Sequence, residues 1–115
     1  MARPAALRFE GERARALEAI YLTPDVVAQR EAVLEALDAR PGERVLDLGV
    51  GPGLLAAAVA ALVGVGGAVH GVDVSEDMLG LAAARSLPEG AARLELSRQG
   101  VTELAFPDGS YDAAV

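Results

Sequence analysis

The sequence predicts an α/β fold built on a doubly wound, mainly parallel sheet with flanking helices. Short apolar runs alternate along the chain with longer stretches of helical pattern, an order typical of parallel strands joined by helices. The second apolar run is almost wholly apolar, as expected for a strand covered on both faces. A cluster of glycines directly follows the first apolar run. Because ligands of such sheets bind beyond the carboxyl ends of the strands, a functional site is expected there.

Two helices are predicted before the first strand. Residues 4–20 mix arginine, glutamate and alanine with a weak apolar stripe of leucine and isoleucine. The second helix, residues 24–39, carries apolar residues at spacings of three and four. Thr23 is its predicted N-cap, Pro24 takes the first helical position, and the Pro-Gly pair at 41–42 ends the helix. We therefore divide the chain into an N-terminal helical extension, residues 1–22, and a main domain, residues 23–115.

The main domain continues as alternating strands and helices. Ser75 is the predicted N-cap of its second crossover helix, and residues 93–97 alternate charged and apolar side chains as an edge strand would. Asp112, near the start of the last apolar run, is expected to be a structural acid. The predicted order is strand 44–48, helix 54–63, strand 68–74, a helix from 75 to about 87, strand 93–97, a turn at 107–110 and the start of a strand at 111–115.

The composition restricts the possible functions. The chain has 115 residues, a net charge of −7 and a hydrophobic fraction of 52%, which predicts one acidic domain with a core of its own. Like charges repel, so neither nucleic acid nor an anionic membrane is expected as a partner. The chain lacks cysteine, which excludes thiolate catalysis and fits a cytoplasmic location. The single histidine, His70, cannot form a metal-binding cluster; we expect a packed or surface role for it and no metal site.

Residues 48–69 carry no charged side chain, and by length alone they could be mistaken for a membrane span. Their glycines divide the segment into a turn, a helix, a second turn and a strand. The sequence therefore predicts a buried core helix here. The N-terminal residues lack the apolar stretch of a secretory signal, so none is expected.

The segment 45–53, with the sequence VLDLGVGPG, has the pattern of a nucleotide-cofactor loop. Gly49, Gly51 and Gly53 allow a sharp turn and a close approach of a ligand to the backbone. The helix that follows directs its free N–H groups toward whatever lies above the turn. A tight strand-to-helix turn without any ligand is the alternative interpretation of this motif alone.

Two acids near the loop indicate which class of cofactor it binds. Asp73 closes the second strand about twenty residues after the last glycine, where an acid accepts hydrogen bonds from the ribose of a nucleoside. A nicotinamide dinucleotide would require the spacing G-x-G-x-x-G, but Leu54 takes the place of its third glycine. Asp47 would also repel a pyrophosphate, whereas a ligand with an ammonium and a sulfonium would be attracted to it. The acids therefore favour a cationic nucleoside cofactor over a dinucleotide.

Three segments together resemble class I S-adenosylmethionine-dependent methyltransferases of the small-molecule branch. They are VLDLGVGPG, GVDVSEDML and LAFPDGSYDAAV, and the resemblance extends over residues 23–115. It implies a Rossmann-like fold, S-adenosylmethionine as cofactor and S-adenosylhomocysteine as product. The cofactor-binding residues that it implies are Asp47, Gly49, Val50, Gly51, Gly53, Asp73, Val74, Met78, Gly100 and Val101, with Tyr21 and Arg30 near the carboxylate end of the cofactor.

The resemblance also implies a role for individual residues. Gly49 and Gly51 would leave backbone room for the methionine moiety, Asp47 would hold its ammonium, and Asp73 would bind the ribose hydroxyls. Val74 and Met78 would line the adenine, and the backbone of Val101 would meet its edge. In the family an acid usually precedes the Val101 position, and this chain has Gly100 there. The loss of one such hydrogen bond costs on the order of 1 kcal/mol, so adenine recognition would rest on backbone and apolar contacts.

The fold implied by the resemblance has a larger sheet than this sequence supplies. We expect the sheet of this chain to be truncated after the fourth strand. The catalytic residues and the methyl acceptor are therefore left open, and methyl transfer to a small molecule is expected only if further sequence or a partner completes the domain. The unpaired C-terminal strand favours a homodimer or a partner chain at this edge. A non-catalytic binding or scaffolding subunit is the alternative, and a nicotinamide-dependent oxidoreductase domain is a weaker one.

Overall fold

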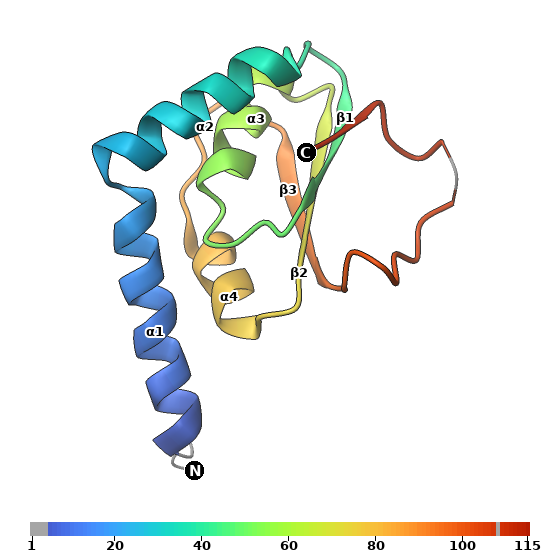
Figure 1. The fold of residues 1–115 in the computed structure, drawn as a ribbon. Coiled ribbons are helices and arrows are strands. Elements are labelled where there is room, and N and C mark those ends of the chain that lie inside the picture. Colours follow the sequence, from blue (N-terminus) through green and yellow to red (C-terminus); the bar gives the residue numbers. More distant parts are fainter. Residues whose placement is uncertain (1–4, 108) are drawn as a thin grey trace.

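The computed structural model describes residues 5–107 and 109–115 (Figure 1). Helices and strands follow the predicted order, and the first strand and the helix after it have the predicted bounds. The elements are α1 (Ala5–Tyr21), α2 (Pro24–Leu37), β1 (Arg44–Leu48), α3 (Leu54–Val63), β2 (Ala68–Asp73), α4 (Glu76–Ala84), β3 (Arg93–Arg98) and β4 (Ala113–Ala114).

The strands form one parallel sheet in the order β3-β2-β1-β4. In the register of β1 and β2, Asp47 lies opposite Gly71 and Leu48 opposite Val72. The carboxyl ends of these two central strands are therefore neighbours, as a parallel α/β sheet requires. β3 is an edge strand with alternating exposure, which confirms the prediction for residues 93–97.

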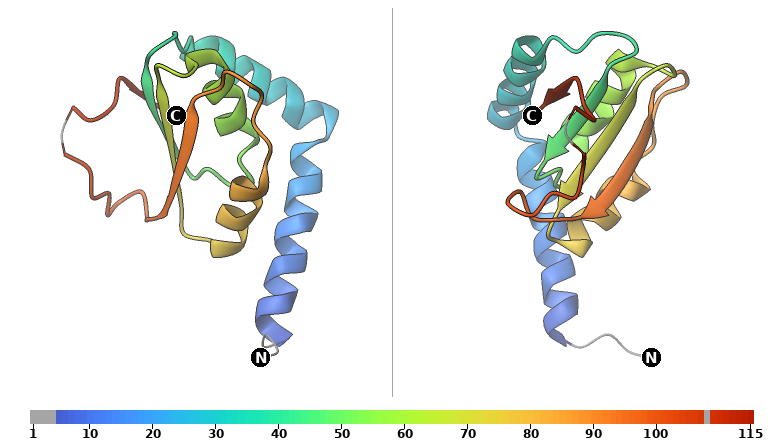
Figure 2. Two further views of the ribbon diagram at one scale, coloured as in Figure 1. Left: turned by 180° about the vertical axis from the view of Figure 1, so that it is seen from behind. Right: turned by 90° about the vertical axis from the view of Figure 1, so that its right-hand side faces the viewer.

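The sheet has different coverings on its two faces. The four helices of the described residues lie on one side, and residues 99–107 and 109–112 lie on the other side, before β4 (Figures 1 and 2). The core lies between the sheet and the helices. It comprises Val45, Val50, Ala56, Val59, Ala60, Val63, Val69 and Ala92, all buried.

Helix α3 is central to this core, which explains why it has no charged face. Ala56 and Ala60 are fully buried, and the carbonyl of Ala60 accepts a hydrogen bond of 2.8 Å from the amide of Ala92. Small side chains allow the helix to approach the sheet and the chain before β3 closely. Within residues 5–107 and 109–115, no helix combines the length and the apolar character that crossing a bilayer needs.

Several element ends differ from the prediction for local reasons. α2 ends at Leu37 because Asp38 adopts a left-handed conformation, with φ of 48°, and caps the helix through its backbone N–H. Thr23 occupies the N-cap position, but its hydroxyl donates to the carbonyl of Ile20 instead of capping α2. β4 is shorter than the predicted strand 111–115. Tyr111 turns toward the sheet face instead of extending the ladder.

His70 anchors the segment that covers the helix-free face. Its Nε2 lies 2.8 Å from the hydroxyl of Ser97 and its Nδ1 lies 3.0 Å from the hydroxyl of Tyr111. Its ring meets that of Phe106 edge to face, with centroids 4.7 Å apart. Burial lowers the pKa of His70 below its usual value. Both its packed role and the structural role of Asp112, whose carboxylate accepts from the amide of Arg44 at 2.7 Å, are confirmed.

Candidate functional site

The glycine-rich loop between β1 and α3 lies at the carboxyl edge of the sheet. Its glycines have positive φ, for example 55° at Gly51 and 86° at Gly53, and residues with a Cβ rarely adopt this conformation. The amide of Val50 donates to the carbonyl of Val72 at 2.8 Å, which ties the loop to the end of β2. The sequence therefore folds here into a tight turn whose backbone faces the ends of the two central strands.

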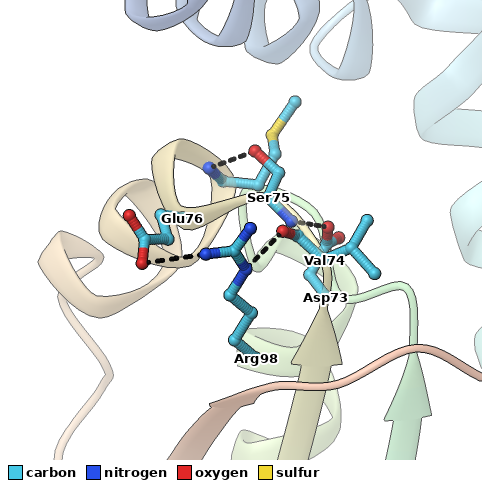
Figure 3. A network of polar contacts seen from close by, with 6 residues as sticks. Asp73, Val74, Ser75, Glu76 and Arg98 are labelled. Carbon is cyan, nitrogen blue, oxygen red and sulfur yellow. Dashed lines mark hydrogen bonds and ion pairs between the residues drawn. The ribbon is translucent and has the colours of Figure 1, made fainter. Parts of the chain in front are cut away.

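Asp73 joins this loop to the turn that begins α4. Its Oδ2 accepts a hydrogen bond of 2.9 Å from the amide of Gly51, and its Oδ1 accepts one of 2.9 Å from the amide of Ser75. Ser75 in turn accepts from the amide of Met78 at 3.2 Å, and this confirms its predicted N-cap role (Figure 3). Two backbone donors thus orient the Asp73 carboxylate, while its remaining lone pairs can still accept from a ligand.

Asp47 is a site residue whose carboxylate is buried without a positively charged group to stabilise its ionised form among the contacts of the described residues. Its exposed fraction is 4%, and its Oδ2 has no hydrogen-bond partner within residues 5–107 and 109–115. Burial, and to a lesser extent the negative charge of Asp73, raise the pKa of Asp47 to about 7. A buried carboxylate without a partner is costly, and a nearby positive charge is what favours its ionised form. The site can therefore hold a cation against Asp47.

The predicted adenine end of the site is more exposed to solvent than the region around Asp47. Val74 and Val101 are exposed, at 64% and 60%, and a Cβ placed on Gly100 would lie 3.9 Å from a methyl group of Val74. Met78 is buried in α4 at 8% exposure. The structure thus leaves Val74 accessible to a flat apolar ligand, and the adenine contact of Met78 stays a prediction.

Arg98 holds the backbone of this region in place. Its Nε donates to the carbonyl of Val74 at 2.9 Å, and its Nη1 pairs with Glu76 at 3.1 Å (Figure 3). Arg98 stands at the end of β3, so it links the edge strand to the turn after β2. No motif in the sequence singled out this arginine, because its partners lie 22 and 24 residues away.

The N-terminal helices complete the site on the loop side. The hydroxyl of Tyr21, at the end of α1, lies 3.3 Å from the point that a Cβ on Gly51 would occupy. Arg30 of α2 donates to the carbonyl of Tyr21 at 3.0 Å. Of these two residues, both expected near the carboxylate end of the cofactor, the structure brings Tyr21 to the glycine loop, and Arg30 binds the backbone of Tyr21.

Two further residues at the site were not predicted from the sequence. Arg85, just after α4, donates through Nε to the carbonyl of Pro52 at 3.0 Å and pairs with Glu18 of α1 at 2.6 Å. Glu18 and Arg85 are 67 residues apart, and no local pattern pairs them. Only the packing of α1 against α4 reveals this contact.

The parallel sheet, the glycine loop and the two acids at the strand ends define an α/β domain of the nucleotide-cofactor-binding class. Residues 45–115 match the family model described as a methyltransferase domain. This chain belongs to that family. The family assignment confirms the methyltransferase prediction and disfavours the nicotinamide-dependent alternative.

Known relatives agree with this assignment. The nocamycin O-methyltransferase of Saccharothrix syringae is 37% identical over 86 residues, which are 75% of this chain and 30% of that protein. The demethylmenaquinone methyltransferase of Geobacillus kaustophilus is 35% identical over 83 residues, 72% of this chain and 36% of that protein. The chain thus spans about a third of the length of the relatives it matches.

Solved structures show the same fold. Phosphoethanolamine N-methyltransferase 2 of Haemonchus contortus, in complex with S-adenosyl-L-methionine, superposes with a TM-score of 0.73 at 32% identity, over 90% of this chain and 25% of that one. The Rossmann-like fold predicted from the sequence is confirmed. The predicted cofactor class is confirmed at the level of the family.

Proposed function

We propose that this chain binds S-adenosylmethionine and forms the cofactor half of a methyltransferase that acts on a small-molecule acceptor. The family match supports the reaction class. The acceptor class is supported by the names of the relatives, which include an O-methyltransferase of nocamycin and a demethylmenaquinone methyltransferase. Because a chain without cysteine fits a reducing compartment, we place this function in the cytoplasm.

The observation that carries the proposal is the buried carboxylate of Asp47 beside the glycine loop, whose Oδ2 has no hydrogen-bond partner in the part of the chain that the structure describes. A structural acid in this position would be expected to have a hydrogen-bond donor or a cation as partner. The ammonium of a bound methionine moiety would supply both a positive charge and donors. The residues present therefore fit S-adenosylmethionine, and they do not fit the pyrophosphate of a dinucleotide.

The other residues divide the remaining tasks. Asp73, already oriented by two backbone amides, would accept from the ribose hydroxyls. The backbone at Gly49 and Gly51 would leave room for the methionine moiety, and Tyr21 would exclude water from above the loop. Bound S-adenosylmethionine supplies an electrophilic methyl group on its sulfonium. Holding the cofactor in one orientation is this chain's contribution to the reaction, since positioning accounts for much of the rate of a displacement.

The proposal is tested by isothermal titration calorimetry of residues 1–115. Saturable binding of S-adenosylhomocysteine with no response to NAD is expected. In Asp73→Ala, the affinity for S-adenosylhomocysteine should fall about tenfold, because charge-assisted hydrogen bonds to the ribose are lost. Glu89→Ala, an exposed acid before β3, is the matched control and should bind like the wild type.

Circular dichroism separates a lost contact from a lost fold, because Asp73 also accepts from Gly51 and Ser75. Asp73→Asn keeps one acceptor oxygen and should lie between the wild type and Asp73→Ala. A folded Asp73→Ala variant with wild-type affinity would reject the ribose role. Binding of NAD in place of S-adenosylhomocysteine would reject the proposed function as a whole.

A further inference from the structure

Arg85 connects three segments that are distant in the sequence. It is the C-cap residue of α4 and has an extended backbone, so its side chain leaves the helix. Its Nε donates to the carbonyl of Pro52 in the glycine loop, and its Nη2 donates to the carboxylate of Glu18 in α1. The side chains of Arg85 and Glu18 are only 23% and 27% exposed, so solvent screens this pair less than a surface ion pair.

The same stretch of α1 contacts the loop a second time. Glu18 and Tyr21 are three residues apart and therefore lie on one face of the helix. The hydroxyl of Tyr21 lies over Gly51, 3.3 Å from the point that a Cβ there would occupy, and Glu18 reaches Pro52 through Arg85. The last turns of α1 thus lie over Gly51 and are linked to Pro52 of the loop through Arg85.

Apolar packing holds this part of α1 only weakly. Leu17 and Ile20 are 46% and 53% exposed, so they contribute little burial to the docking of the helix. A partly buried ion pair with a charge-assisted hydrogen bond to a backbone carbonyl is a comparatively strong interaction. The Glu18–Arg85 pair is therefore expected to decide whether α1 stays against the loop.

We propose that Arg85 is a positioning residue that couples the docking of α1 to the conformation of the glycine loop, so that α1 covers the methionine end of the cofactor site. This inference rests on the proposed function. Arginine suits the task because its planar fork donates in two directions at once, whereas lysine offers a single point charge. Loss of the pair should release α1 and allow the cofactor to leave faster.

The first test uses the free protein and needs no cofactor. Trypsin cleaves after arginine, and α1 contains Arg13 and Arg15. In Glu18→Ala, cleavage at these two positions should be several-fold faster than in the wild type, while the thermal midpoint changes little. Arg93→Gln, which breaks the exposed pair with Glu95, is the matched control and should be cleaved at Arg13 and Arg15 like the wild type. Unchanged cleavage of Glu18→Ala would overturn the coupling.

The second test measures S-adenosylhomocysteine dissociation by surface plasmon resonance. Glu18→Ala and Arg85→Ala should each speed dissociation about tenfold, the effect of losing one strong interaction. S-adenosylhomocysteine should dissociate from the double variant no faster than from Arg85→Ala, because the same bridge is lost in both proteins. Arg85→Lys should be intermediate. Additive effects of the two substitutions, or wild-type dissociation from folded Glu18→Ala, would overturn the proposal.

The two tests also separate this inference from the proposed function. If the wild type binds S-adenosylhomocysteine and the variants behave like the wild type, the positioning role of Arg85 is wrong and the proposed function stands. If the wild type does not bind S-adenosylhomocysteine, the proposed function is wrong and the cofactor coupling falls with it. The trypsin result then decides by itself whether the pair holds α1 in place.

Discussion

Asp47 combines near-complete burial with a neighbouring carboxylate and no hydrogen-bond partner for Oδ2 among the described residues. Its pKa of about 7 lies above the usual value of 3.8, so the folded state binds this proton more tightly than the unfolded chain does. Protonation of Asp47 therefore stabilises the fold. That stability is full below about pH 4 and is lost as the pH rises toward 7.

The first prediction concerns this linkage. In urea titrations from pH 4 to pH 8, the free energy of unfolding of the wild type should fall relative to that of Asp47→Asn. The difference should change by roughly 1.4 kcal/mol for each pH unit between about pH 4 and pH 7 and level off above pH 7. At pH 8 the Asn variant should be the more stable of the two. Parallel profiles for the two proteins would show that Asp47 is not a buried, raised-pKa acid.

At the scale of the elements, the spacing of α3 and α4 depends on a glycine. A Cβ on Gly53, the N-cap of α3, would lie 2.9 Å from the Cβ and 3.0 Å from the Cα of Ala82 in α4. Part of this contact is backbone, so it cannot be relieved by a rotamer change. Gly53 therefore allows α4 to pack against the start of α3, next to the site.

The second prediction tests this close contact. Gly53→Ala combines overpacking with a φ of 86° and should destabilise the protein by about 3 kcal/mol. Gly80→Ala, in the interior of α4, is the matched control, because nothing lies within 4 Å of its added Cβ. It should stabilise the protein by up to about 1 kcal/mol. Thermal unfolding of both variants measures the effects, and equal midpoints would contradict this account of the contact.

At the scale of the whole molecule, the two sheet edges differ. β3 is an edge with charged, exposed positions, whereas β4 is a short apolar edge whose ladder neighbour among the described residues is β1. Unpaired apolar edges favour pairing with another chain. We propose that residues 1–115 on their own self-associate at β4.

The third prediction follows from this edge. Light scattering over a range of concentrations should show self-association of residues 1–115. Ala114→Lys should reduce it, because a charge on an edge strand opposes pairing. Ala83→Lys, at an exposed position of α4, serves as the control and should associate like the wild type. A monomer at all concentrations would show that the edge is protected in another way.

Much of the fold could be predicted because its signals are local. Apolar runs, helix caps and the glycine loop lie within a few residues of one another, and the bounds of β1 and α3 follow from them. The ends of α2, α4 and β4 were predicted too long. α2 ends at Asp38, whose left-handed backbone the apolar pattern does not show. The ends of α4 and β4 depend on Arg85 and Tyr111, whose contacts with other elements no window of sequence shows.

For the site, the sequence by itself determined which residues gather at the carboxyl edge, because parallel strands that end in acids and glycines must meet there. Tertiary structure alone decided the state of those residues. Asp73 accepts from Gly51 across 22 residues, Arg85 pairs with Glu18 across 67, and Asp47 has no partner for Oδ2 among the residues that the structure describes. Burial sets the pKa of Asp47, and long-range contacts orient Asp73 and hold α1 against the loop. These properties arise only when distant segments pack together.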